Sequence, residues 1–361
     1  MSSVLFSWIV NKVWQFFSPF SGLPFSIYST FVIEERHGFN QQTAWFYVKD
    51  QIKGFILGQV IMLPLVAAII KIVYWGGDFF FLYLWAFVVG FTLFMMILYP
   101  EFIAPLFDKY TPLPEGELRT EIEKLAASIE FPLYKLFVVE GSKRSSHSNA
   151  YFYGFFKFKR IVLFDTLLEE NERNKLKTEE ELKEQEEKDK DKDEKEVEKD
   201  KKKGCSNDEI LAVLGHELGH WKLNHVLKNI MISEVHILAM FALFGYLYSH
   251  QALYAAFGFN DGERPVLIGM MIILQFITAP YNAVLDFAMT ALSRRFEFQA
   301  DEFAVNLGRA EKLQSALIKL NNDNLGFPIY DWLFSAWHHS HPPILERLAV
   351  LRTKQAQKKQ D

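Results

Sequence analysis

Long stretches of this sequence are mostly apolar on all sides of a helix, and they alternate with stretches that are rich in polar residues. A helix needs about 20 mostly apolar residues to cross a membrane. Four runs reach that length: Phe55–Trp75, Phe79–Tyr99, Ile230–Phe259 and Val266–Leu292. The last run is interrupted by Pro280 and Asp286. Four such runs in one chain favour membrane spans over the buried helices of a soluble protein.

A fifth, N-terminal span is a weaker prediction. Val13–Ile33 carries no charge, but it holds Pro19, Gly22 and Pro24, which makes it a poor helix. No basic region precedes a compact apolar core with a small-residue cleavage site, so the sequence does not indicate a signal peptide.

Basic residues beside the spans predict their orientation. They flank the spans on one side: Lys49, Lys53, Lys222, Lys228, Arg294 and Arg295. The opposite turn, 260–264, carries two acidic residues and one arginine. Because cytoplasmic loops carry an excess of Lys and Arg, the large polar segments are expected in the cytosol.

The long central loop has its own pattern. Leu118–Ser128 is typical of an amphipathic helix, Lys135–Glu140 and Arg160–Phe164 are typical of strands, and Asn149–Phe152 is a candidate third strand. Segment 169–203 then holds 16 acidic and 12 basic residues with almost no apolar ones. It cannot bury a core, so it is either a solvated charged helix or a linker.

Composition narrows the function classes. Half of the residues are hydrophobic and the net charge is −5, so there is no basic footprint for nucleic acid. Cys205 is the single cysteine and cannot form an intramolecular disulfide, which fits a reducing compartment.

The first candidate chemistry is the motif HELGH. His216 and His220 are four residues apart, so on a helix they share a face and can bind one Zn²⁺. Glu217 lies beside the first ligand and can polarise water at the metal, as in the HExxH zinc metalloproteases. The alternative is an ordinary helix with two surface histidines.

A zinc site needs a third protein ligand and an open position for water. The downstream candidates are Glu297 and His341. Glu297 and Asp301 are also four apart, so Glu297 could bind the metal while Asp301 orients a ligand imidazole. The alternative is two solvated carboxylates beside the neighbouring arginines. Two spans separate HExxH from Glu297, so both return to the same membrane face.

Four further polar residues have open roles. His341 and Arg347 could stabilise the oxyanion that develops on a metal-bound carbonyl, or they could belong to an ordinary surface helix. His225 and His236 are interpreted as structural histidines whose hydrogen bonds are satisfied.

Three motifs together carry a family resemblance. HELGHW, SRRFEFQAD and SHPPILERL, in this order and with two spans between the first pair, resemble the type I CAAX prenyl proteases. The resemblance implies a mainly α, polytopic helical membrane protein that encloses a water-filled chamber, with a small cytosolic β/α zinc-metalloprotease portion. Glu234 and Asp286, within apolar runs, also hint at water inside the bundle.

The resemblance also assigns residues. It implies one Zn²⁺ per chain held by His216, His220 and Glu297, with Glu217 as the base. It places His341 and Arg347 near the tetrahedral intermediate, with Asp301 behind the ligands. It implies that Asn149 and Ala150 form a strand edge which pairs with the substrate backbone.

Motifs and spans together predict four segments. They are N-terminal membrane helices in 1–104, a cytosolic protease segment with the charged insert and the HExxH helix in 105–228, two membrane helices in 229–292, and a C-terminal protease segment that completes the zinc site in 293–361.

The expected activity is removal of the C-terminal tripeptide after a prenylated cysteine, with a second upstream cleavage in some members. The expected partners are prenylated CaaX proteins and the lipid bilayer, without nucleic acid, and the chain is expected to be a monomer. Lys358–Lys359 resembles a retrieval signal, so the endoplasmic-reticulum membrane and the inner nuclear membrane are the expected locations. Alternatives are a quality-control metalloprotease for misfolded or translocon-clogging chains, and a non-catalytic scaffold.

The N-terminus departs from the family pattern. The resemblance implies seven spans, of which the sequence shows four clear ones and one doubtful one. We therefore expect the first two family spans to be absent from this sequence. A chamber that lacks wall helices would be leaky or inactive, as in a truncated isoform.

Overall fold

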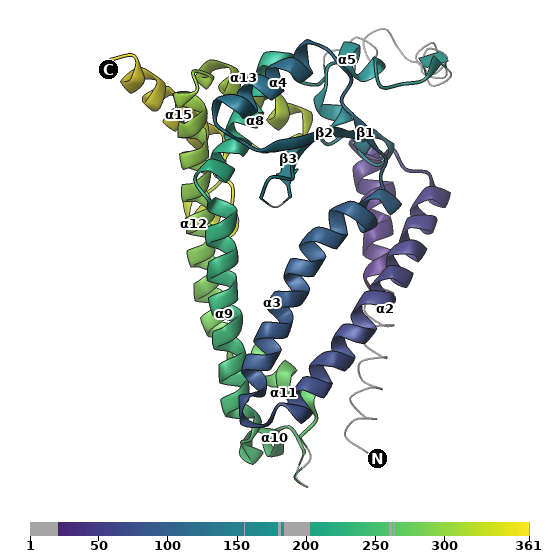
Figure 1. Cartoon of the computed structure of the whole chain (residues 1–361), viewed down its shortest axis with the longest axis vertical. Helices are drawn as coiled ribbons and strands as arrows, with labels where there is room; N and C mark the ends of the chain where they lie inside the picture. The colour runs from purple at the N-terminus through teal and green to yellow at the C-terminus, as the bar shows by residue number, and fades with distance from the viewer. Residues whose placement is uncertain are drawn as a thin grey trace. The chain divides into compact units, whose positions relative to one another are not determined.

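The long apolar stretches form the helices of one structural unit, and the polar stretches build a second unit around a small sheet (Figure 1). The computed structural model describes residues 21–154, 156–179, 182–183, 203–259, 262 and 264–360. The first unit comprises Met1–Ile97 and Leu227–Asp286, and the second comprises Leu98–Val226 and Phe287–Asp361. Each unit is therefore assembled from two separate stretches of chain.

Three helical segments in the described residues are long and apolar enough to cross a membrane. They are α2 (Ala44–Trp75), the segment Gly77–Leu106 around α3 (Phe80–Leu98), and α9 (His225–Tyr248). Only 6% of the most apolar window of the first two is buried inside the protein. Helices that are apolar on all sides and yet uncovered need lipid around them, so these segments are membrane spans.

The fourth candidate span is bent. It consists of α11 (Val266–Met271), a helical turn at Ile272–Ile277, and α12 (Ala279–Asn306), with a 61° bend between the two arms. Pro280 lies in the first turn of α12, directly after the break. Proline lacks a backbone N–H and fits a first turn, which explains why the apolar run breaks there.

Aromatic side chains pack the helices of the first unit together. The rings of Phe80 and Phe244 meet edge to face with centroids 5.6 Å apart, and Tyr248 packs against both rings. The Trp85 Nε1–H donates to the backbone oxygen of Glu234 at 3.1 Å. These contacts join α3 to α9.

One predicted span is wrong in its second half. The run Ile230–Phe259 does not form one helix, because α9 ends at Tyr248 and a separate α10 (Gln251–Ala256) follows. His250, between them, has extended backbone with ψ of 102°, which interrupts the helical hydrogen bonding. The apolar pattern continues across this break and therefore did not reveal it.

Two uncertain segments fall partly outside the described residues. Of Val13–Ile33, residues 13–20 lie outside them, and residues 21–36 are helical despite Pro24, with a wider helical turn at Ser29–Glu34. Of the charged segment 169–203, the structure describes a short helix α5 (Glu170–Asn174) near its start, and most of the remainder lies outside the described residues.

The second unit is built on a four-stranded sheet in the order β1-β2-β4-β3. Its strands are β1 (Tyr110–Pro112), β2 (Leu133–Val139), β3 (Ala150–Tyr153) and β4 (Lys159–Phe164). β2 and β4 are parallel, and the outer strands are antiparallel to their neighbours. Strand β1 is too short to show a pattern and was not predicted. Ile161 and Leu163 point from one face of the sheet into the core of this unit.

Helices cover that face of the sheet. They are α4 (Glu117–Ser128) and α8 (Asn207–Lys222). Besides α5, the second unit also contains residues 287–306 of α12, α13 (Ala310–Asp323), α14 (Trp332–His338) and α15 (Ile344–Lys358). Shorter helical turns lie at Gly77–Phe79, Tyr99–Ile103, Ala104–Leu106, Gly141–Lys143 and Asp165–Leu167. Leu118 and Ile122 of α4 and Leu214 and Leu218 of α8 are buried in one core cluster, so α8 is packed into the core of the second unit.

Candidate metal centre

The two histidines of the HExxH motif lie on α8, whose start is well defined. Ser206 and Glu209 form a capping box in which each side chain bonds the other residue's backbone N–H. This box satisfies backbone donors that a helix start otherwise leaves open. His216 and His220 follow on one face of α8, with ring centroids 4.8 Å apart.

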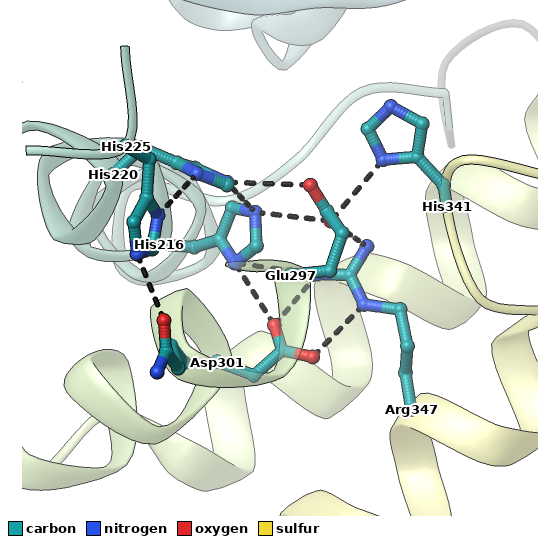
Figure 2. Close-up of polar contacts among 8 residues, drawn as sticks. His216, His220, His225, Glu297, Asp301, His341 and Arg347 are labelled. Carbon is teal, nitrogen blue, oxygen red and sulfur yellow. Dashed lines mark hydrogen bonds and ion pairs between the residues drawn. The ribbon is translucent and has the colours of Figure 1, made fainter. Parts of the chain in front are cut away.

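Glu297 on α12 completes a group of three ligand atoms (Figure 2). Glu297 Oε1 lies 3.3 Å from His220 Nε2, and Oε2 lies 3.5 Å from His216 Nε2. The two Nε2 atoms are 3.2 Å apart. Among the described residues this is the one group of three His, Cys, Asp or Glu with ligand atoms so close together.

These distances fit a tetrahedral zinc ion. Two ligand atoms that each lie about 2.0–2.1 Å from one zinc ion are roughly 3.3 Å apart in tetrahedral geometry. Glu297 is buried, and its Oε2 lies within 3.5 Å of His216, His341 and Arg347, so the carboxylate is held among nitrogen donors. Two imidazoles and one carboxylate are also a ligand set found in catalytic zinc sites.

The other nitrogen of each histidine is occupied, which leaves Nε2 for a metal. His216 Nδ1 lies 2.9 Å from Asp301 Oδ1, and His220 Nδ1 lies 3.0 Å from His225 Nδ1. A hydrogen bond of this kind fixes the tautomer and the ring orientation of a ligand histidine. Figure 2 shows both contacts on the side of the rings away from Glu297.

Asp301 is itself held by Arg347. Arg347 Nε and Nη2 donate to the two oxygens of Asp301 at 2.9 and 2.6 Å, and Asp301 is fully buried. Arg347 Nη1 also lies 3.4 Å from Glu297 Oε2. Arg347 therefore supports the candidate ligand His216 through Asp301.

His225 has a second role that the sequence interpretation missed. It was interpreted as a structural histidine whose hydrogen bonds are satisfied; its Nδ1 lies 3.0 Å from Nδ1 of the candidate ligand His220, and its Nε2 lies 3.0 Å from Gln299 Oε1. Its ring also stacks on Phe296 at 4.0 Å. The sequence offered one sign of this role of His225: its partner Gln299 is two residues after Glu297, on the helix that carries the candidate third ligand.

His341 reaches the site from the segment before α15. Its Nδ1 lies 3.2 Å from Glu297 Oε2, while 71% of its side chain is exposed. The bond with Glu297 raises the pKa of His341 above its usual value, although burial opposes this. His341 can therefore carry a proton and still meet an incoming substrate.

Burial opposes nearby charges and hydrogen bonds in the electrostatics of α8, and the outcome differs between Glu217 and His216. Burial raises the pKa of Glu217, and the nearby His216 and His220 only partly oppose this. For His216, burial and Arg347 disfavour the charged form, but the bonds with Asp301 and Glu297 outweigh them and raise its pKa to about 9. A carboxyl group with a raised pKa is suited to exchanging protons near neutral pH.

Asn149 and Ala150 lie at the free edge of the sheet. β3 is an outer strand, and it packs close to α8. The Asn149 backbone oxygen accepts from the Phe164 N–H at 3.0 Å, within the sheet. The Ala150 N–H is occupied by the Asn149 side-chain oxygen at 2.8 Å. A peptide that adds to this edge would compete with that side chain, and its binding stays a prediction.

Comparisons with known proteins agree with this architecture. Residues 112–355 match the family model of peptidase family M48, and residues 2–109 match a model described as the CAAX prenyl protease N-terminal region with five membrane helices. The chain is similar to the "CAAX prenyl protease 1 homolog" of Homo sapiens, at 58% identity over 93% of this chain and 71% of that protein.

Relatives with lower sequence identity are also similar over most of the chain. The "CAAX prenyl protease 1 homolog" of Caenorhabditis elegans is 52% identical over 93% of this chain and 74% of that protein. The crystal structure of S. mikatae Ste24p matches with a TM-score of 0.79 and 37% identity, over 93% of this chain and 73% of the other. The likeness therefore extends over both units.

Proposed function

The chain belongs to peptidase family M48, and on this premise we propose that it is a zinc endopeptidase that removes the C-terminal tripeptide from prenylated CaaX proteins. Family membership makes it a metallopeptidase, and its helices make it a multi-pass membrane protein. The observation that carries the proposal is the convergence of His216 Nε2, His220 Nε2 and Glu297 on one point.

These three side chains would hold one Zn²⁺ per chain. When bound, the ion would act as a Lewis acid on the scissile carbonyl. Glu217, next to the first ligand, would take a proton from the attacking water and deliver it to the leaving amine. His341 and Arg347 would stabilise the oxyanion of the tetrahedral intermediate, since both carry N–H donors beside Glu297.

The membrane spans support a lipidated substrate. A prenyl chain partitions into the bilayer and raises the local concentration of the attached peptide near the protein. Pairing of the peptide with the β3 edge at Asn149 and Ala150 would align its backbone largely regardless of its side chains. The proposal includes a second, upstream cleavage, a monomeric state, and residence in the endoplasmic-reticulum and inner nuclear membranes.

The test is a paired assay in liposomes with a farnesylated CaaX peptide and its unmodified twin. We expect clearly faster cleavage of the farnesylated peptide, mainly through a lower KM, and no cleavage by Glu217→Gln. Equal kcat/KM for both peptides would contradict the proposal and favour quality-control proteolysis. A zinc-loaded protein that cleaves neither peptide would favour a non-catalytic role.

A further inference from the structure

An ordered segment of the second unit exposes far more apolar surface than a soluble surface carries. We call residues Leu325–Trp337 the aromatic segment; it lies between α13 and α15 and includes all of α14 except its last residue. Its large exposed apolar side chains are Leu325, Phe327, Ile329, Tyr330, Trp332, Leu333, Phe334 and Trp337. Trp332 is 75% exposed and Phe327 is 65% exposed. Contiguous apolar patches of this kind mark a surface that is covered in the working protein.

This exposure is built into the fold. The Asp331 carboxylate caps α14 by accepting from the N–H groups of Leu333 and Phe334 at 3.0 and 2.9 Å. Ser335 is fully buried, and its hydroxyl accepts a hydrogen bond from Arg294 Nη1 at 3.1 Å. The inward side of α14 is thus anchored to α12, and the apolar side chains are held outward.

The aromatic segment packs on α12, the helix that forms the second arm of the fourth candidate span. The Trp337 ring stacks on Phe287 of α12, with centroids 4.9 Å apart. Val284, one turn earlier on α12, is 68% exposed, and it belongs to the arm that forms the fourth candidate span. The aromatic segment therefore packs at Phe287 on the helix that continues the fourth candidate span.

The composition of the segment identifies what covers it. Its one charged residue is Asp331, whose carboxylate already accepts two backbone hydrogen bonds. It contains two tryptophans and a tyrosine, the residues that are enriched where hydrocarbon meets headgroups. It contains no lysine or arginine, so attraction to anionic lipid is not required.

We propose that the aromatic segment inserts into the interfacial layer of the bilayer beside α12, as a shallow membrane anchor that is present without substrate. The anchor immediately precedes His341, so it would hold this part of the metal centre close to the membrane surface. A second copy of the chain, or the lipid of a substrate, could instead cover the same surface, and the experiment below separates these occupants.

The experiment uses the full chain with Cys205→Ala and Glu217→Gln, so that proteolysis plays no part in the result. A fluorophore is attached to Leu333→Cys, or to Trp332→Cys in a second variant, in nanodiscs of phosphatidylcholine without substrate. The matched control is Ala127→Cys, an exposed position on α4 of the same unit. The readout is quenching by lipids that carry a spin label near the carbonyl end of the acyl chain, compared with quenching by a water-soluble nickel chelate.

We expect the spin-labelled lipid to quench the probes in the aromatic segment several-fold more strongly than the control probe, with no dependence on salt. Quenching by the nickel chelate alone would overturn the proposal. If neither quencher reaches the probes and the protein is a dimer in solution, the surface would be assigned to a second copy of the chain. Protection from the chelate that requires a farnesylated peptide would assign it to substrate. Failure of the cleavage assay would leave this result unaffected.

Discussion

At the scale of single residues, the metal centre has two layers. His216, His220 and Glu297 converge on one point, and Asp301 and His225 hold the far sides of the two imidazoles. The two layers predict different consequences of substitution, because in the proposed function an inner residue would bind the metal or move a proton, whereas an outer residue would orient a ligand.

Glu217 and Glu297 should behave differently although both are glutamates near the site. Glu217→Gln should keep the metal and lose turnover by on the order of 100- to 10,000-fold, because it removes the base and no ligand. Glu297→Ala should lose the metal as well. Metal content of the purified variants, measured beside peptide cleavage, tests this, and a metal-free Glu217→Gln protein would show that the roles are wrongly assigned.

His341 should affect the transition state more than substrate binding. If it stabilises charge that develops only in the transition state, His341→Ala should lower kcat by about 100- to 1,000-fold with a smaller effect on KM. Metal content should not change, since the site keeps its three ligand residues. His338→Ala, three residues earlier at the end of α14, is the control. A near-normal kcat for His341→Ala would return this residue to a structural role.

His225 should contribute to metal affinity without touching the metal. His225→Ala removes the hydrogen bond to His220 Nδ1, and loss of such a partner typically weakens metal binding by roughly 10- to 100-fold. Competition with a chelator of known affinity measures the change. His236→Ala, on the same helix, should leave the affinity unaltered. Equal affinities of the His225 variant and the unsubstituted protein would rule out the positioning role.

At the scale of secondary-structure elements, the start of α8 is tied to α13. The buried Glu209 carboxylate accepts from the Ser206 N–H at 2.9 Å, the Ser315 hydroxyl at 2.5 Å and Lys319 Nζ at 3.1 Å. Burial alone would raise the pKa of Glu209, but these bonds outweigh it and lower the pKa below its usual value. The ionised form is therefore the one that stabilises the fold.

Glu209→Gln should destabilise the protein at neutral pH and much less in acid. A lowered folded-state pKa contributes stability above the unfolded-state pKa, and this contribution is lost as pH falls through the folded value. We expect a loss of about 1–3 kcal/mol at pH 7, typical of buried hydrogen bonds to charged groups. Thermal unfolding in detergent at neutral and acidic pH measures this. Asp208→Asn, the exposed neighbour, is the control, and equal shifts for the two variants would contradict the prediction.

At the scale of the whole molecule, water should reach polar positions within the membrane spans. Asp286 lies in an apolar run of α12 and is exposed, and we expect a carboxylate within such a run to face a water-filled space. In a Cys205→Ala background, Asp286→Cys should react with a membrane-impermeant thiol reagent. Val284→Cys, two residues earlier and also exposed, should be protected by lipid. Equal reactivity of the two would argue against a wet chamber beside a lipid-facing surface.

The sequence alone predicted the family, the mainly helical membrane class and the metallopeptidase activity, and the comparisons confirm these. These features depend on local patterns. Apolar runs report spans because a bilayer has a fixed thickness, and a four-residue spacing brings two imidazoles to one helical face. The early end of α9 at Tyr248 was missed because lipid-exposed helices and their breaks share the same apolar composition.

Only the tertiary structure decided which distant side chains meet. Glu297 and His341 were both candidates for the third ligand, and the fold places the Glu297 carboxylate against both Nε2 atoms while His341 lies at its outer side. The pairing of His225 with His220 and Gln299, and the outward aromatic segment, also depend on how α8, α12 and α14 pack. Such contacts join residues that are far apart in the chain, and no periodic pattern records the direction in which a side chain points after the helices have packed.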